Sequence, residues 1–130
     1  MKRFKDLLLE AKRKSKSIQP NDLYGKIKKN NNFILLDIRE LDEFQEQSIE
    51  NAILLPRGLL ELHIENVVSS RDHDIVVFCD NGSRSSLAAL TLQIMGYNNV
   101  KYLYGGVNAW KEQELPLNNN PVDKIENYAD

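Results

Sequence analysis

Cysteine and histidine are scarce in this sequence, which has one cysteine and two histidines among 130 residues. A single cysteine cannot form an internal disulfide, and the scattered His63 and His73 do not provide the ligand spacing of a common metal site. Proteins without disulfides are typical of reducing compartments. We therefore expect a cytoplasmic protein that uses no metal and no other cofactor.

Long hydrophobic runs are also missing. The longest, "FILLDI" at 33–38 and "IVVFC" at 75–79, are much shorter than the ~20 residues that an α-helix needs to cross a bilayer. No secretory hydrophobic stretch follows the first lysines. The sequence therefore predicts neither a membrane span nor a signal peptide.

An excess of one charge is absent overall, since the formal net charge is only -2, but the charge is unevenly distributed. The basic N-terminal segment has four apolar residues at helical spacing, Phe4, Leu7, Leu8 and Ala11. This spacing predicts an amphipathic helix within an N-terminal extension, residues 1–20. A basic helix face can bind RNA or a membrane surface, but Phe4 is the only aromatic residue of this segment, so aromatic side chains do not alternate with its lysines. The favoured interpretation is a helix docked on its own domain, and we expect no nucleic-acid partner.

The rest of the chain alternates apolar runs with amphipathic segments. Strands are predicted at 33–38, 52–56, 75–79 and 99–104, and helices at 22–29, 41–47, 58–68, 84–95 and after Gly105 and Gly106. Strands that are apolar on both faces are typical of a mostly parallel sheet covered by helices on both sides. The sequence therefore predicts a single α/β domain over 21–117, with a four- to five-stranded sheet and a polar tail at 118–130 in which Ile125 and Tyr128 could anchor the chain.

Two of the predicted helices have expected core faces. The expected buried side chains are Leu59, Leu62, Ile64 and Val67 in the helix at 58–68, and Leu87, Ala88, Leu90, Thr91 and Ile94 in the helix at 84–95. Gly96 is the expected end of the second helix. Trp110 and Tyr104 are interpreted as core or pocket-wall residues, and the two histidines as parts of a helix face and a turn.

The only cysteine, Cys79, ends the third predicted strand in "VVFCDNGSRSS". In parallel sheets, ligands gather where loops leave the carboxyl ends of the strands. A short loop from Cys79 to a helix starting near Ser83 or Arg84 must curve tightly, and Asn81 and Gly82 tolerate the backbone angles required. Successive N–H groups of such a loop, together with the helix N-terminus, form a nest that stabilises a thiolate. The alternative is a buried thiol that only fills space.

The loop Cys79, Asp80, Asn81, Gly82, Ser83, Arg84 resembles the C-x-x-G-x-R active-site loop of rhodanese domains. Three further segments are similar to that family: "LLDIRELDEF", "NAILLP" and "MGYNNVKYLYGGVNAW". The similarity covers residues 33–116. It implies a rhodanese-like fold and a sulfurtransferase in which Cys79 takes sulfane sulfur from a donor such as thiosulfate, polysulfide or a persulfide. The resulting Cys79 persulfide would pass the sulfur to a thiol or to a protein acceptor.

The same resemblance suggests roles for charged residues near the loop. Arg84 is expected to fix the loop or neutralise an anion, and Arg57, after the second strand, could meet the anionic group of a donor. Asp37 and Arg39 are expected to form a structural polar network. Asp80 would repel a dianion such as thiosulfate if its carboxylate faces the pocket. The segment "QSIENA" replaces the family's G-H-I-P-G-A, so the shape of that turn is not predicted.

Two other functions stay open at this stage. Phosphatases and arsenate reductases use a C-x5-R loop, which is one residue longer and fits a tetrahedral oxyanion, whereas this chain has C-x4-R from Cys79 to Arg84. A second alternative is a persulfide carrier or regulatory binding module without catalytic turnover. The sequence does not separate a carrier from a catalyst, and it makes no prediction of oligomeric state.

Overall fold

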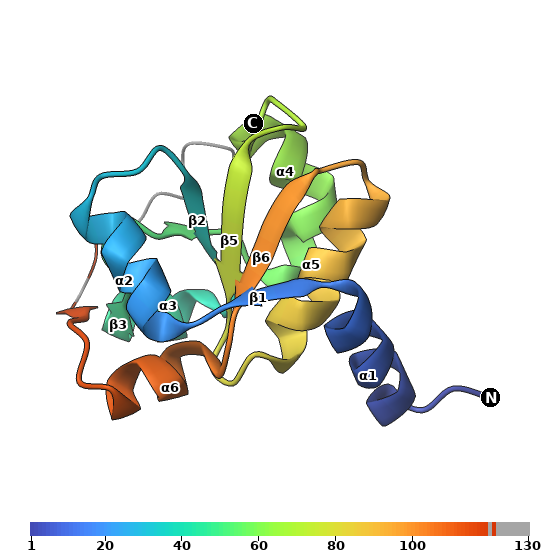
Figure 1. The fold of residues 1–130 in the computed structure, drawn as a ribbon, viewed down its shortest axis with the longest axis horizontal. Helices are drawn as coiled ribbons and strands as arrows, with labels where there is room; N and C mark the ends of the chain where they lie inside the picture. Colours follow the sequence, from blue (N-terminus) through green and yellow to red (C-terminus); the bar gives the residue numbers. More distant parts are fainter. Residues whose placement is uncertain (120, 122–130) are drawn as a thin grey trace.

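The computed structural model describes residues 1–119 and 121 and has a five-stranded sheet at its centre (Figure 1). The strand order is β1-β6-β5-β2-β4, and all neighbouring pairs are parallel. The strands are β1 (Lys16–Ile18), β2 (Ile34–Asp37), β4 (Ile53–Leu54), β5 (Asp74–Phe78) and β6 (Asn99–Leu103). The predicted α/β class with a parallel sheet is confirmed, and the carboxyl ends of all five strands lie at one edge.

Helices cover both faces of the sheet, as predicted. The side chains of a strand alternate between its two sides, so apolar residues lie on both faces and both have to be covered. The side chains of Ile75 and Val77 on β5 lie on the face of the sheet that is covered by α4 (Leu60–Val67) and α5 (Ser83–Ile94). The side chains of Val76 and Phe78 lie on the other face, which is covered by α2, α3 and α6. The bounds of these helices are α2 (Pro20–Lys28), α3 (Leu41–Glu46) and α6 (Gly106–Glu112). Cys79 continues the alternation and belongs to the α5 side.

The N-terminal helix α1 (Phe4–Lys14) packs against α5 instead of against the sheet. Ala11 is buried in this contact, but Phe4 is 60% exposed, so only the C-terminal part of the predicted apolar face is covered. After α1 the chain enters β1, which pairs with β6 and forms one edge of the sheet. This strand was not predicted because its residues, Lys16 and Ser17 above all, lack an apolar pattern.

The predicted core face of α5 is mostly wrong, since Ala88 is the one residue of the predicted set that is fully buried. The residues buried in α5 are Ser85, Ser86, Ala88, Ala89 and Leu92, whereas Ile94 is 79% exposed. The helix lies between the sheet and α1, and small side chains on its buried face allow a close approach to its neighbours. Gly96 follows the helix with a φ of 100°, which agrees with its predicted role as the terminating residue.

The predicted core face of the next helix, α4, is also partly wrong. A 3-10 turn, Arg57–Leu59, precedes α4, and the buried residues of the helix are Leu60 and Ile64. Leu62 is 72% exposed, and Leu59 is exposed as well. Leu60 and Ile64 are four residues apart and therefore lie on the same face of the helix, which is the buried face. The predicted set combined Ile64 from this face with Leu62 from the exposed face.

Two short strands outside the main sheet were not predicted. β3 (Gln47–Ser48) pairs antiparallel with β7 (Asn118–Asn119), so the start of the predicted polar tail contacts the region after α3. Polar residues of this kind give no strand pattern. The expected anchors Ile125 and Tyr128 lie outside the described residues. Within residues 1–119 and 121, no helix has the length and apolar character required to cross a membrane.

Candidate active site

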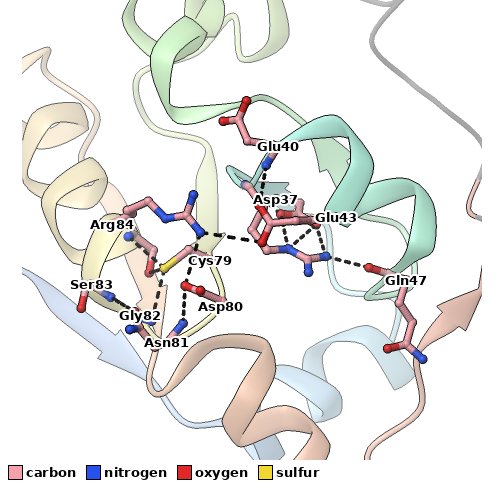
Figure 2. A network of polar contacts seen from close by, with 12 residues as sticks. Asp37, Glu40, Glu43, Gln47, Cys79, Asp80, Asn81, Gly82, Ser83 and Arg84 are labelled. Carbon is pink, nitrogen blue, oxygen red and sulfur yellow. Dashed lines mark hydrogen bonds and ion pairs between the residues drawn. The ribbon is translucent and has the colours of Figure 1, made fainter.

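Cys79 follows β5 directly at the carboxyl edge of the sheet (Figure 2). Its side chain is fully buried. Gly82 caps the N-terminus of α5 with a φ of 93°, a backbone conformation that favours glycine. The chain therefore reverses between strand and helix within a few residues, as the sequence predicted. The sulfur lies in the concave side of this turn and faces the first turn of α5 (Figure 2).

Three hydrogen bonds surround the sulfur. The N–H groups of Gly82 and Ser85 donate to Cys79 Sγ at 3.2 and 3.4 Å, and the thiol donates to Ser85 Oγ at 3.4 Å. Two backbone N–H dipoles are thus directed at a single atom and can hold negative charge that develops on it during a reaction. Ser85 was not predicted as a site residue, although its position in the first turn of the following helix could have indicated it.

The remaining loop amides are not all directed at the sulfur, which corrects the expectation of a nest made from successive N–H groups. The N–H of Asn81 donates to Asp80 Oδ1 at 2.8 Å, and the N–H of Ser83 donates to Asn81 Oδ1 at 2.9 Å. Short polar side chains compete for local amides in this way in many turns. They fix the loop conformation, and they reduce the number of amides available to Sγ.

Arg84 bridges the loop and α3. Its guanidinium lies 3.3 Å from Asp80 Oδ1 and 4.0 Å from Glu43 Oε2 (Figure 2). Partial burial lowers the pKa of Arg84, but the hydrogen bond and the charge of Asp80 outweigh this and raise the pKa above its usual value. The predicted contact between Arg84 and the loop is therefore present, with its positive charge compensated by two carboxylates. Glu43 was missed because the pairing joins segments far apart in the sequence.

The structure does not bring Arg57 into contact with the loop. Its guanidinium pairs with Glu61 Oε1 at 2.8 Å and donates to Thr91 Oγ1 at 3.4 Å, on α4 and α5 respectively. A donor would have to compete with Glu61 for this cation. The expected role of Arg57 in binding a donor is thus left as a prediction without a supporting contact.

The expected polar network of Asp37 and Arg39 is confirmed. Both side chains are buried, and Arg39 donates to Asp37 through Nε at 3.0 Å and Nη2 at 2.8 Å. Ser48 Oγ donates to the same carboxylate at 2.8 Å, and Arg39 also donates to the carbonyl of Gln47 at 2.7 Å. The network ties the end of β2 to β3, on either side of the helix that provides Glu43.

Helix α6 supports the loop from behind. The N–H groups of Val107 and Asn108 donate to the carbonyls of Cys79 and Asp80, both at 2.9 Å. Gly106, with a φ of 61°, lies so close that an added Cβ would be 2.5 Å from each of these carbonyl oxygens. The sequence indicated a turn at the Gly105–Gly106 pair, but it gave no indication that the turn touches the cysteine loop.

A pocket of about 210 Å³ lies beside Asp80. Its lining residues are Arg39, Glu43, Glu46, Gln47, Asp80, Val107, Asn108 and Lys111. Three of the five charged residues among them are acidic.

The two aromatic residues that were interpreted as core or pocket-wall residues differ in their positions. Trp110 is buried in the core, whereas Tyr104 is exposed and lines a different pocket. His63 lies on α4 and His73 in a bend before β5, as expected.

Comparison with known proteins identifies the class of this α/β fold with a cysteine loop. The chain matches the model of the rhodanese-like domain over residues 19–113, and it belongs to this family. A protein named sulfurtransferase from Allochromatium vinosum is 34% identical over 84 residues, which are 65% of this chain and 77% of the relative. Three other curated relatives are much longer, and the chain spans only 23–26% of their length.

Two solved structures illustrate the range of proteins with this fold. A protein of unknown function from Rhodopseudomonas palustris, described as a possible tyrosine phosphatase, has a TM-score of 0.84 and 28% identity, covering 91% of this chain and 96% of the other. The polysulfide-sulfur transferase homodimer from Wolinella succinogenes has a TM-score of 0.75 and 28% identity, covering 94% and 88%. At the level of the family, the comparisons support a rhodanese-type sulfur-transfer role.

Proposed function

We propose that the chain is a sulfurtransferase that carries sulfur on Cys79. In the first half-reaction the Cys79 thiolate attacks the outer sulfur of a donor, R–S–SH. A new bond forms between Sγ and that sulfur, the donor's S–S bond breaks, and the donor leaves as the thiolate RS⁻. The product on the protein is a Cys79 persulfide. The observation that carries the proposal is the convergence of the Gly82 and Ser85 N–H groups on Sγ.

In the second half-reaction an acceptor thiol attacks the outer sulfur of the persulfide. The Sγ–S bond breaks and its electron pair returns to Sγ. The transferred sulfur keeps its proton in the new acceptor persulfide, and the acceptor's thiol proton passes to solvent. Amides that are already oriented toward Cys79 stabilise the returning negative charge without reorganisation, as in an oxyanion hole. The acceptor is proposed to be a small thiol or a sulfur site on another protein.

The charges around the loop favour a donor with low negative charge. Arg84 is compensated by Asp80 and Glu43, and Arg57 is compensated by Glu61. A dianion such as thiosulfate would therefore approach carboxylates whose neighbouring guanidinium groups are already paired. Among the described residues, the cations that line the two pockets beside the loop without an ion pair are Lys111 and Lys12. An organic persulfide, or a polysulfide of low charge, meets less repulsion. We therefore propose that thiosulfate is a poor donor for this chain.

Intact-mass measurement after exposure to polysulfide tests the proposal directly. One added sulfur, about 32 Da, is expected of the covalent intermediate, and cyanide should remove it. The chain has only one cysteine, so the site of labelling is unambiguous. If no sulfane-sulfur donor adds this mass, both sulfur transfer and the alternative role as a persulfide carrier are excluded. Repeated turnover with a thiol acceptor distinguishes the enzyme from the carrier.

Substitution of Asp80 by asparagine should make thiosulfate a better donor. The change removes a carboxylate at the loop and releases Arg84 from one of its two ion pairs. We expect kcat/KM for thiosulfate to rise about tenfold, equivalent to ~1.4 kcal/mol of transition-state stabilisation. Glu46→Gln is the matched control, because Glu46 lines the same pocket without an ion pair to Arg84 among the described residues. Equal gains in both variants would show that total charge, not the Asp80–Arg84 pair, decides donor choice.

A phosphatase is the second candidate, because one similar structure is described as a possible tyrosine phosphatase. The loop of this chain argues against it, since Cys79 to Arg84 is C-x4-R and two loop amides are already occupied by Asp80 and Asn81 side chains. Few donors remain for the three outer oxygens of a phosphoryl group. We expect aryl-phosphate hydrolysis at background level, and substantial hydrolysis that depends on Cys79 would reverse this ranking.

A further inference from the structure

A second pocket, of about 160 Å³, adjoins the cysteine loop at the carboxyl end of β6. Its lining residues are Lys12, Asn81, Gly82, Tyr102, Tyr104 and Gly105, and none of them lines the pocket beside Asp80. The volume is below the roughly 300–1,000 Å³ of clefts that hold drug-sized ligands. A ligand for this pocket is therefore small.

The charge of this pocket is positive. Lys12 is its only charged lining residue, and the ammonium group makes no ion pair with any residue in the described part of the chain. Glu10, an acid near Lys12 on α1, is occupied by Lys2 at 3.4 Å and Lys14 at 3.3 Å. The other lining groups are an amide side chain, two tyrosines and glycine backbone. Such a set of one cation and several neutral polar groups suits a small anion.

The pocket depends on the N-terminal segment, which lies outside the family match at 19–113. Lys12 comes from α1, which is held against the domain by its packing on α5 and by the pairing of β1 with β6. Ser15, in the turn between α1 and β1, also donates to the carbonyl of Ser86 at 3.4 Å. The position of Lys12 beside the loop is therefore set by α1 and β1, which lie outside the residues that match the rhodanese-like model.

Gly82 connects this pocket to the reactive sulfur. Its backbone forms part of the pocket wall, and its N–H donates to Cys79 Sγ at 3.2 Å. An added Cβ on Gly82 would be 3.3 Å from the backbone nitrogen of Gly105, so the loop and the end of β6 are in close contact. A ligand that touches Gly82, Gly105 and Lys12 together would tie the loop to β6 and α1. Because Cys79 is fully buried, a reagent reaches Sγ only after a neighbouring segment moves, and the loop that carries Gly82 is in direct contact with Sγ.

We propose that this pocket is a binding site for a small organic carboxylate, which pairs with Lys12 and holds the loop closed over Cys79. The site is separate from the reaction at Sγ, since Cys79 is not among the lining residues. Its existence does not require that the chain transfers sulfur. Sodium propionate is a suitable probe, and propionamide is its neutral counterpart of nearly the same shape.

Backbone amide chemical shifts in a titration with propionate test binding. We expect saturable shifts at Gly82 and Gly105 that propionamide and sodium chloride do not reproduce. Lys12→Gln should weaken the affinity roughly threefold to fivefold, the size expected for loss of one exposed ion pair. Lys14→Gln is the matched control, because Lys14 lies on the same helix but does not line the pocket. Shifts that do not saturate, or equal weakening in both variants, would overturn the proposal.

Alkylation by iodoacetamide, a neutral reagent, tests the effect on the loop. A ligand that binds only the closed loop, present at ten times its Kd, should slow alkylation of Cys79 about tenfold. The single cysteine ensures that the rate reports this residue alone. The slowing should be lost with propionamide and reduced in Lys12→Gln. Saturable binding without any change in this rate would disprove the closure of the loop. Failure of sulfur transfer in the mass experiment would leave both measurements valid.

Discussion

Replacing Cys79 by serine should lower sulfur transfer at least about a thousandfold, the loss expected when a catalytic nucleophile is removed. A serine hydroxyl is a much weaker nucleophile at neutral pH than a thiolate, and it cannot form a persulfide. The substitution is nearly isosteric, and the hydroxyl oxygen can still accept from the Gly82 and Ser85 N–H groups. Steady-state transfer from polysulfide to cyanide measures the effect. The melting temperature should stay within a few degrees of the parent value.

Ser85→Ala provides the graded comparison for this experiment. It keeps the nucleophile and the Ser85 N–H, and it removes only the hydroxyl at 3.4 Å from Sγ. When the thiol is deprotonated, the Ser85 hydroxyl can turn and donate to Sγ, and loss of this one hydrogen bond of ~1 kcal/mol predicts a decrease of about fivefold. If Cys79→Ser retained a tenth of the parent activity, the chemistry would not pass through this sulfur, and the proposed mechanism would be rejected.

Gly106→Ala should destabilise the fold and damage the active-site loop together. The new Cβ would lie 2.5 Å from the carbonyl oxygens of Cys79 and Asp80, and the positive φ of 61° adds backbone strain for alanine. We expect a loss of about 3 kcal/mol in the free energy of unfolding, combining the left-handed conformation with steric overlap. Both carbonyls also accept from α6 amides, so the overlap would push the loop away from its support.

Denaturant unfolding of Gly106→Ala, together with the rate of persulfide formation in the folded protein, checks both parts of the prediction. Gly25→Ala is the control, because Gly25 lies within α2 and an added Cβ there meets no atom within 4 Å. This control should gain about 0.5–1 kcal/mol, since alanine is favoured over glycine inside a helix. A Gly106 variant with parent-like stability would show that the contact between α6 and the loop is readily relaxed.

The sequence predicted those parts of the structure that depend on local patterns. Apolar runs such as "IVVFC" predicted the central strands, and the spacing from Cys79 to Arg84 predicted the sharp loop between β5 and α5. The family resemblance gave the type of chemistry, and the matched model over residues 19–113 agrees with it. Glycine positions were informative because few other residues adopt positive φ.

Contacts between distant segments were beyond these patterns. The pairing of Arg84 with Glu43, the support of the loop by Val107, and the pairing of β1 with β6 join residues far apart in the sequence. The prediction of the buried helix faces failed for a related reason, since the buried face of α5 is set by two neighbours and consists mostly of small residues. Helical periodicity gives most weight to large apolar side chains, so it placed Ile94 on the buried face, whereas this side chain is exposed.

The pairing of β1 with β6 also has a consequence for solubility. The family match begins at residue 19, so a chain shortened to that boundary would lack β1 and leave the main-chain N–H and C=O groups of β6 without their partner strand. An uncovered strand edge of this kind is a template for pairing with other chains. The strand β1 therefore covers an edge of β6 that could otherwise pair with another chain.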